Sequence, residues 1–140
     1  MALILLIDDD PLVADIVDAG LSREGHTVGV LSDGRRALQI VEFKRPALVL
    51  LDCAMPLVPG VEVLRQIRAS KICFAVPVLM LTARDRRADR DIAMRAGATG
   101  YMCKPFDMEH LILTVDEMVS DGQSGRHSAW NGSGVGRNAG

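Results

Sequence analysis

Polar side chains that could bind a metal ion or carry a phosphoryl group follow four short apolar runs. They are Asp8 and Asp9 after Leu3–Ile7, Asp52 after Ala47–Leu51, Thr82 after Val78–Leu81, and Lys104 after Tyr101–Cys103. Each run has the composition of a strand buried in a parallel sheet. Ligands of an open α/β sheet bind where the carboxyl ends of its strands meet solvent. We therefore predict that these side chains converge on one small charged site.

The carboxylates of Asp8, Asp9 and Asp52 predict a site for a hard divalent cation. In a five-stranded sheet of this kind, the first and third strands are neighbours, so their carboxyl ends lie together. Carboxylates this close repel one another until one takes up a proton or a cation joins them. Oxygen ligands without histidine or cysteine favour Mg²⁺, which retains waters for a phosphate-bearing partner. We expect Mg²⁺ or another divalent cation here.

An ionised carboxylate beside a metal ion and an ammonium group suits phosphoryl transfer. Asp52 would attack an activated phosphoryl group and become an acyl phosphate. Lys104, a flexible point charge, would help the metal to neutralise the phosphoryl oxygens, and Thr82 could donate its hydroxyl to one of them. Taken singly, each residue also has a structural interpretation, as a loop cap, a helix cap or a solvated charge. The combination favours the chemical site.

The elements that must position these residues follow a repeating strand–helix pattern. Strands are predicted at about 2–7, 27–31, 47–51, 77–81 and 99–103. Asp10 is expected to cap the first helix, with Pro11 at its first position, Asp33 to open the second, and Asp107 to cap the last. Five such units predict a parallel α/β sheet with helices on both faces.

Helical periodicity predicts the inward residues of each helix. They are Leu12, Val13, Ile16, Val17 and Leu21; Ala37, Leu38 and Val41; Val61, Leu64 and Ile67; Ala88, Ile92 and Ala96; and Leu111, Ile112, Val115, Met118 and Val119. The fourth helix, at about 85–96, has a thin apolar face, and Gly97 is expected to end it as a left-handed cap.

Composition narrows the class of protein. The chain has 140 residues, enough for one domain, and its core must be aliphatic because it holds only one Trp, one Tyr and three Phe. A net charge of -2 without a dense basic block does not suggest direct nucleic-acid binding. Cys53, Cys73 and Cys103 lack metal-site spacing and predict reduced thiols in the cytoplasm. No apolar run approaches the roughly 20 residues that span a bilayer.

The last twenty residues differ from the rest. Six are Gly and three are Ser, and none is Leu, Ile or Phe. We predict a folded domain over 1–120 and a flexible Gly/Ser-rich tail or truncated linker over 121–140. Both a stand-alone domain and a fragment of a larger regulator or hybrid kinase remain open.

The chain resembles the receiver domain of two-component response regulators over about residues 2–119. The segments that carry the resemblance are LILLIDDDP, LVLLDCAMPLVPG, PVLMLTA and GATGYMCKPF, in this order. The resemblance implies a flavodoxin-like (βα)5 fold, a doubly wound five-stranded parallel sheet in the order 2-1-3-4-5. It also implies a phosphorylatable signalling switch that catalyses only its own phosphorylation and dephosphorylation, rather than a metabolic enzyme.

The resemblance assigns roles to the residues of the site. Asp52 would accept a phosphoryl group from a histidine kinase or a histidine phosphotransfer protein. Asp9, Asp52 and the Ala54 carbonyl would bind Mg²⁺ directly, and Asp8 mainly through water. Lys104 would pair with the phosphoryl group.

The resemblance also implies a conformational response. Thr82 and Tyr101 match the switch pair of the family, in which the hydroxyl moves to the phosphate and the ring turns inward. An aromatic residue on a sheet-edge strand is the alternative for Tyr101. The fourth helix, fifth strand and last helix would form a surface for a downstream partner, an output domain or a second copy in a phosphorylation-dependent homodimer.

The arginines of the fourth helix have two interpretations. They are Arg84, Arg86, Arg87, Arg90 and Arg95, and they either form a solvated face braced by Asp85, Asp89 and Asp91 or contribute to that partner surface.

Three positions depart from the common family pattern. Pro59 stands where many members carry Asp before the Gly, which predicts a stiffer loop with intact chemistry. Ala54 and Arg84 occupy positions that influence hydrolysis of the acyl phosphate in the family. Because neither clearly positions a water molecule, we predict slow to moderate self-dephosphorylation.

Three other functions are alternatives for this sequence. A flavodoxin-like FMN protein shares the sheet order, but Asp8-Asp9-Asp10 would repel a phosphate in the absence of a metal. A small-substrate phosphatase with an aspartyl nucleophile needs a nearby acid/base carboxylate and a cap domain, and Asp52 is followed by Cys53-Ala54. A degenerate receiver would lack part of the acidic, hydroxyl and lysine set.

Overall fold

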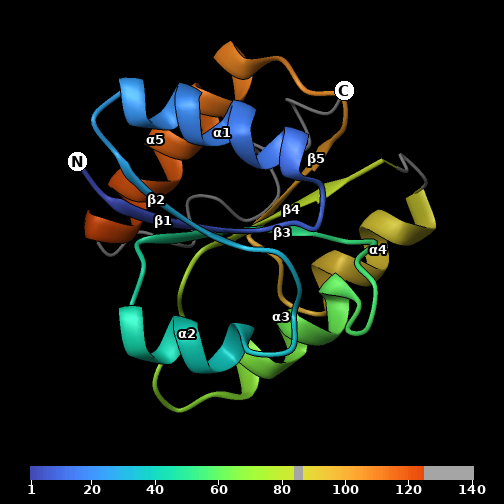
Figure 1. The fold of residues 1–140 in the computed structure, drawn as a ribbon. Coiled ribbons are helices and arrows are strands. Elements are labelled where there is room, and N and C mark those ends of the chain that lie inside the picture. The colour runs from blue at the N-terminus through green and yellow to red at the C-terminus, as the bar shows by residue number, and fades with distance from the viewer. Residues whose placement is uncertain (84–86, 125–140) are drawn as a thin grey trace.

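The computed structural model describes residues 1–83 and 87–124, which fold into one sheet between two layers of helices (Figure 1). The strands are β1 (Leu3–Ile7), β2 (Thr27–Leu31), β3 (Leu48–Asp52), β4 (Val78–Thr82) and β5 (Gly100–Cys103). They pair in parallel in the order β2-β1-β3-β4-β5, which confirms the predicted flavodoxin-like topology. The helices are α1 (Pro11–Arg23), α2 (Ala37–Lys44), α3 (Gly60–Ala69), α4 (Arg87–Arg95) and α5 (Met108–Ser124). Helices α1 and α5 cover one face of the sheet, and α2, α3 and α4 cover the other (Figure 1).

The last helix of the domain extends past the predicted boundary at residue 120. Helix α5 continues to Ser124, so residues 121–124 extend the last helix of the domain. Residues 125–140, which make up most of the predicted tail, lie outside the described residues, as do residues 84–86 of the loop before α4.

The central strands carry the core. Every residue of β3 and β4 is buried, and so are Ile4–Ile7 of β1. These strands are continuous runs of Leu, Ile, Val and Met because a sheet covered on both faces buries both sets of alternating side chains. The outer strand β2 is only partly buried. The polar residues that follow the central strands are therefore anchored by the least mobile part of the molecule.

Two of the three expected helix starts are confirmed. The Asp10 side chain accepts a hydrogen bond from the Leu12 backbone N–H, and Pro11 occupies the first turn of α1. Asp107 accepts one from the Glu109 backbone N–H at the start of α5. Asp33 does not open α2, which begins only at Ala37. The carboxylate of Asp33 instead accepts from the Arg35 backbone and side chain, so it orders the turn before the helix.

The predicted inner face of α1 is wrong at two positions. Leu12 and Ile16 are exposed, at 68% and 54%, and the buried residues are Ala14, Val17, Gly20 and Leu21. The small residues turn inward because α1 packs closely against α5. A Cβ on Gly20 would lie 2.6 Å from the sulfur of Met108 at the start of α5. Periodicity counts large apolar residues and does not detect such close packing.

Helix α4 is also rotated relative to the prediction. Ala88 and Ile92 are exposed, and Ala93 is the buried residue of α4. Arg90 lies partly buried, with its guanidinium carbon 5.3 Å from the centre of the Tyr101 ring. This arginine therefore does not belong to a purely solvated face. Gly97 follows α4 with φ +107°, which confirms the predicted left-handed cap.

Arg68 of α3 ties the end of α4 to the sheet. Its guanidinium donates to the carbonyls of Gly97, Phe74 and Val76 and to the Thr99 hydroxyl. These bonds join the C-terminal cap of α4 to the loop before β4. Arg68 thus anchors the C-terminal end of the described part of α4.

The backbone of Gly60, at the start of α3, lies against the backbone of Asp52 and Cys53 at the end of β3. A side chain at position 60 would therefore be strongly destabilising. A Cβ on Gly60 would lie 2.1 Å from the Asp52 carbonyl oxygen. We expect Gly60→Ala to lower the free energy of unfolding by about 2 kcal/mol or more. Chemical denaturation measures this. Gly29→Ala is the matched control, because its Cβ would meet only Leu5 at an ordinary 3.5 Å. Equal stability of the two variants would contradict the close approach.

Candidate functional site

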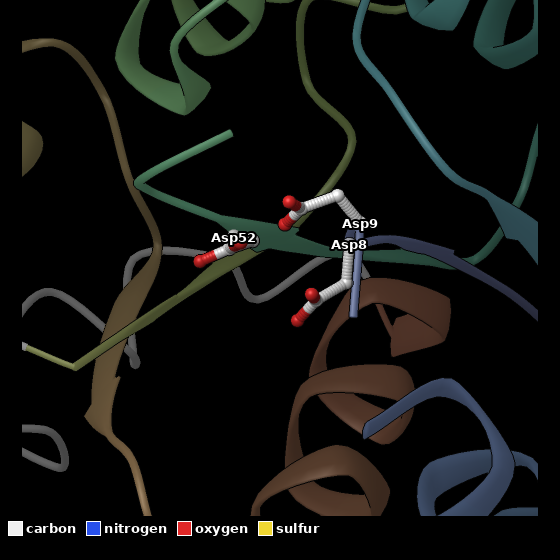
Figure 2. Close-up of side chains that lie close together, drawn as sticks. All are labelled: Asp8, Asp9 and Asp52. Carbon is white, nitrogen blue, oxygen red and sulfur yellow. The ribbon is translucent and has the colours of Figure 1, made fainter. Parts of the chain in front are cut away.

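Three carboxylates meet at the carboxyl ends of β1 and β3. Asp8 and Asp9 follow β1, and Asp52 is the last residue of β3 (Figure 2). One oxygen from each lies within 4.8 Å of the others. Asp8 and Asp52 are buried, at 1% and 5% exposure, whereas Asp9 is exposed at the mouth of the cluster. The predicted convergence of these side chains is confirmed.

Lys104 reaches this cluster from the end of β5. Its Nζ lies 2.8 Å from Asp8 Oδ2 and 3.4 Å from Asp52 Oδ1. The lysine backbone N–H donates to the Thr82 carbonyl at 2.6 Å, and the Lys104-Pro105 peptide bond is cis. Burial alone would lower the pKa of Lys104. The hydrogen bond with Asp8 and the charges of Asp52 and Asp8 together outweigh burial and raise that pKa, so the amine stays charged at neutral pH.

Asp8 is fully engaged within the protein. Its Oδ1 accepts the Asp10 backbone N–H at 2.9 Å, and its Oδ2 accepts from Lys104. Asp52 is held differently, because its Oδ1 faces both Lys104 and the Ala54 backbone N–H at 3.4 Å. The Oδ2 atom of Asp52 takes part in neither contact. Asp8 is therefore a fixed support, and Asp52 has a carboxylate oxygen left for chemistry.

Asp52 carries an electrostatic cost. Burial raises its pKa, and the negative charge of Asp8 raises it further, while Lys104 and the Ala54 N–H oppose the shift. Holding a buried carboxylate beside another one without a full complement of positive charge is unfavourable. A bound cation would relieve this repulsion.

The donors suit a hard divalent cation. Asp9 and Asp52 supply carboxylate oxygens close together, and cysteine and histidine take no part in the cluster of described residues. Magnesium binds few carboxylates and keeps several waters. Asp8, whose oxygens are already engaged, fits an indirect role better than a direct one. The Ala54 carbonyl as a ligand stays a prediction.

Thr82 lies at the centre of a second set of contacts, next to the acidic cluster. Thr82 and Tyr101 are buried, at 3% and 4% exposure, and their hydroxyls are hydrogen-bonded. The ring of Tyr101 therefore lies inward, beneath the guanidinium of Arg90. Burial raises the pKa of Tyr101, so its phenol stays neutral.

Cys53 lies close to Thr82, because both residues line one cavity, although neither its residue type nor its spacing marks it as part of the site. Burial raises the pKa of its thiol to about 11. The signal that was available is positional. Cys53 directly follows Asp52, and its backbone N–H donates to the carbonyl of Leu81, so it lies beside Thr82 across the strand ends.

A family model described as the response regulator receiver domain matches residues 4–116. The chain belongs to this family. Receiver domains are signalling switches and not true enzymes, and the acidic pocket of Asp8, Asp9 and Asp52 is the pocket for phosphorylation and Mg²⁺ as in response regulators. The assignment decides against the flavin-binding and small-substrate phosphatase alternatives. The complete pocket also argues against a degenerate receiver.

Curated relatives match over the same region. The chain is 40% identical over 103 residues to the alkaline phosphatase synthesis transcriptional regulatory protein PhoP of Bacillus subtilis, covering 74% of this chain and 42% of PhoP. It is 41% identical over 116 residues to the response regulator MprA of Mycolicibacterium vanbaalenii, covering 83% of this chain and 49% of MprA. The chain thus spans about half the length of the curated relatives that it matches.

Solved structures support the fold and the site. The chemotaxis protein CheY4 of Vibrio cholerae superposes with a TM-score of 0.80 at 30% identity, covering 84% of this chain and 98% of CheY4. The receiver domain of a sensor histidine kinase of Pseudomonas aeruginosa superposes with a TM-score of 0.79 at 31% identity. The match covers 85% of this chain and 98% of that receiver domain. That structure has a magnesium ion coordinated in its active-site cleft. Among the described helices of the present protein, none is long and apolar enough to cross a membrane.

The raised pKa of Asp52 predicts that its ionised carboxylate destabilises the metal-free fold. Below the ordinary value of 3.8 the carboxyl is protonated in the folded and the unfolded chain alike. As pH rises from there through the raised pKa, the unfolded chain loses its proton first, so the metal-free fold loses stability. We expect Asp52→Asn to stabilise the metal-free protein at pH 7 by about 1 kcal/mol.

Thermal or chemical denaturation in EDTA measures this difference. Asp15→Asn on the exposed surface of α1 is the control and should leave stability unchanged. Saturating Mg²⁺ should reduce the difference in free energy of unfolding between Asp52→Asn and the wild type, because only the wild type gains a full metal site. A less stable Asp52→Asn variant in EDTA would contradict the electrostatic account.

Proposed function

We propose that Asp52 is the phosphoacceptor of this receiver domain and that Asp9, Asp52 and the Ala54 carbonyl hold Mg²⁺. The observation that carries the proposal is the arrangement of Lys104, whose ammonium group lies between the buried carboxylates of Asp8 and Asp52. A lysine in this position can follow the negative charge when it moves onto a phosphoryl group. The solved receiver domain with magnesium in its cleft supports the choice of ion.

The donor would be a phosphohistidine of a cognate histidine kinase or a histidine phosphotransfer protein. An Asp52 oxygen attacks the phosphorus, the P–N bond to histidine breaks, and the leaving nitrogen takes up a proton. Bound Mg²⁺ supplies positive charge to the phosphoryl oxygens. Lys104 turns toward the same oxygens, and Asp8 keeps its place through the Asp10 N–H. The Ala54 N–H remains near the Asp52 carboxylate.

The output would be a change of surface at α4, β5 and α5. Thr82 would turn toward a phosphoryl oxygen, and the ring of Tyr101, which already lies inward in this structure, would be kept in that orientation. Helix α4 buries only Ala93 among its described residues, so its attachment is weak and easily shifted. The partner would be a downstream protein, an output domain or a second copy, in the cytoplasm and without direct contact to nucleic acid.

Phosphorylation by a small donor tests the proposal. With Mg²⁺ and acetyl phosphate, the intact mass of the wild type should increase by one phosphoryl group. Asp52→Asn and an EDTA-treated sample should show no gain, because the nucleophile or the ion is missing. An unmodified wild type, or an Asp52→Asn variant that still gains a phosphoryl group, would refute the assignment.

Asp9 provides a separate test of the metal site. We expect Asp9→Asn to weaken Mg²⁺ binding by about tenfold, because one of two direct carboxylate ligands is lost. Isothermal titration calorimetry measures the affinity. Asp10→Asn is the matched control, since it removes a neighbouring charge while asparagine still caps α1. Similar affinities for the two variants would place the ion elsewhere.

The lifetime of the acyl phosphate tests the expectation drawn from Ala54. Ala54 is exposed and offers no side-chain group to orient an attacking water. The second position used in that prediction, Arg84, lies outside the described residues. Loss of phosphate followed by intact mass after removal of the donor should take minutes or longer, and a half-life of seconds would contradict slow hydrolysis.

A further inference from the structure

A pocket of about 290 Å³ lies at the amino ends of β3 and β4, whereas the acidic cluster lies at the carboxyl ends of the strands. We call it the amino-end pocket, and its apolar lining includes Pro46, Ile72, Phe74, Pro77 and Val119. Ile72 and Phe74 are 49% and 57% exposed, so large apolar side chains border the pocket at the surface. Exposed apolar groups gathered around a pocket mark interaction sites. The amino-end pocket is therefore a candidate docking site.

Hydrogen bonds fix the loop that carries Ile72 and Phe74. The Ser70 hydroxyl accepts from the Ile72 backbone N–H at 3.0 Å. Farther along the loop, the carbonyls of Phe74 and Val76 accept from the Arg68 guanidinium at 2.9 and 2.6 Å. An ordered loop loses little conformational freedom when a partner binds, which favours association. The exposed apolar side chains are thus presented by a backbone that is already in place.

Arg45 is the only charged residue among the described residues that line the amino-end pocket. It ends α2 in the left-handed conformation, with φ 50°, where glycine is the usual residue. Its Nε donates to the Glu42 carbonyl at 3.2 Å, and its two terminal nitrogens have no partner within residues 1–83 and 87–124. A long side chain that occupies an unfavourable backbone conformation and keeps two donors unused indicates a binding role.

The charge around Arg45 favours a carboxylate as its ligand. The carboxylate of Glu42, on the same helix, is engaged elsewhere, because its Oε2 accepts from the Ser70 hydroxyl at 2.7 Å. Lys44 and Lys71 precede Arg45 and Ile72 in the chain, and both lysines are exposed. The border of the pocket on the side of α2 and α3 is therefore positive. A guanidinium with two available donors binds a carboxylate through a pair of parallel hydrogen bonds.

We propose that the amino-end pocket binds an acidic, apolar segment of a protein partner. An aromatic or aliphatic side chain of the partner enters the pocket, and a neighbouring carboxylate pairs with Arg45. Residues 125–140 of the chain itself are less suited, because they contain two arginines and no acidic residue. Asp52 ends β3 at the opposite edge of the sheet, so the partner can bind whether or not the phosphoacceptor is modified. The inference thus goes beyond the proposed function and does not depend on it.

Synthetic peptides test the chemistry of the partner. The probe is a short peptide in which Phe and Leu alternate with Asp, and in the matched control peptide Asn replaces Asp. Each is titrated into the ¹⁵N-labelled full chain, and the amide shifts locate the binding site. We expect shifts at Arg45, Ile72 and Phe74, with a Kd at or below about 1 mM for the Asp peptide. The Asn peptide should bind about tenfold more weakly, because it cannot form the charged pair with Arg45.

Variants assign the contacts. Arg45→Gly should weaken binding of the Asp peptide about tenfold, although glycine suits the left-handed position and should not lower the denaturation midpoint. Phe74→Ala should weaken binding about fivefold or more, because it removes an apolar wall of the pocket. Phe43→Ala is the matched control, since Phe43 is 78% exposed and does not line the pocket, and it should bind as the wild type does.

Binding of the Asp peptide that depends on Arg45 and Phe74, and not on Phe43, supports the inference. No binding at about 1 mM peptide, equal affinity for the Asp and Asn peptides, or amide shifts confined to other residues overturns it. The comparison of the two peptides needs no variant, so it remains decisive if a variant folds poorly.

Two other occupants of the amino-end pocket have their own signatures. Trp130 is the only tryptophan and lies in residues 125–140. A shift of its fluorescence emission in Phe74→Ala would assign the pocket to that segment of the chain. Self-association of the wild type that Arg45→Gly abolishes, measured by sedimentation, would assign it to a second copy. Either result overturns the inference of an acidic partner.

Discussion

The mutual repulsion of three carboxylates, held together by one lysine, is the constraint on which the rest of the structure depends. Asp8 and Asp52 are buried beside each other, and Lys104 lies between them. One ammonium group cannot balance three negative charges, so the pocket retains affinity for a further cation. This repulsion lowers the stability of the metal-free domain. The domain still folds because the burial of the strands that end at the site stabilises it independently.

The topology makes that constraint possible. Pairing of β1 with β3 brings Asp8 and Asp9 next to Asp52, although more than forty residues separate them in the chain. Pairing of β4 with β5 brings Lys104 to the same edge, where its backbone bonds to Thr82. Asp52 and Thr82 are the last residues of their strands, and Asp8, Asp9 and Lys104 follow a strand end by one or two positions. Small shifts in register would therefore separate them.

Thr82 connects the pocket to the outer surface. Thr82 lines one cavity with Cys53, the residue after Asp52, and its hydroxyl bonds to Tyr101, whose ring lies under Arg90 of α4. The C-terminal end of α4 is held by Arg68 through the Gly97 carbonyl. A change at Thr82 can thus reach α4 through Tyr101 and Arg90, while the Arg68 contacts resist movement at the far end of the helix.

Apolar runs and the residues that end them were sufficient to predict the sheet, its five units and the convergence of Asp8, Asp9, Asp52 and Lys104. Periodicity failed where packing depends on small residues, as at Gly20 of α1, and where a charged residue lies over an aromatic ring, as at Arg90 of α4. The placement of Cys53 beside Thr82 could not be predicted because a cysteine after an aspartate has no distinctive pattern. Only the placement of neighbouring strand ends reveals it.

The most direct test of the account identifies which carboxyl group carries the phosphoryl group. Protein treated with acetyl phosphate and Mg²⁺ is reduced with borohydride, which converts an acyl phosphate to the corresponding alcohol, and its peptides are sequenced by mass spectrometry. The account predicts homoserine at position 52 and unmodified aspartate at positions 8 and 9. Reduction at either of those two positions, or at none of the three, would contradict it.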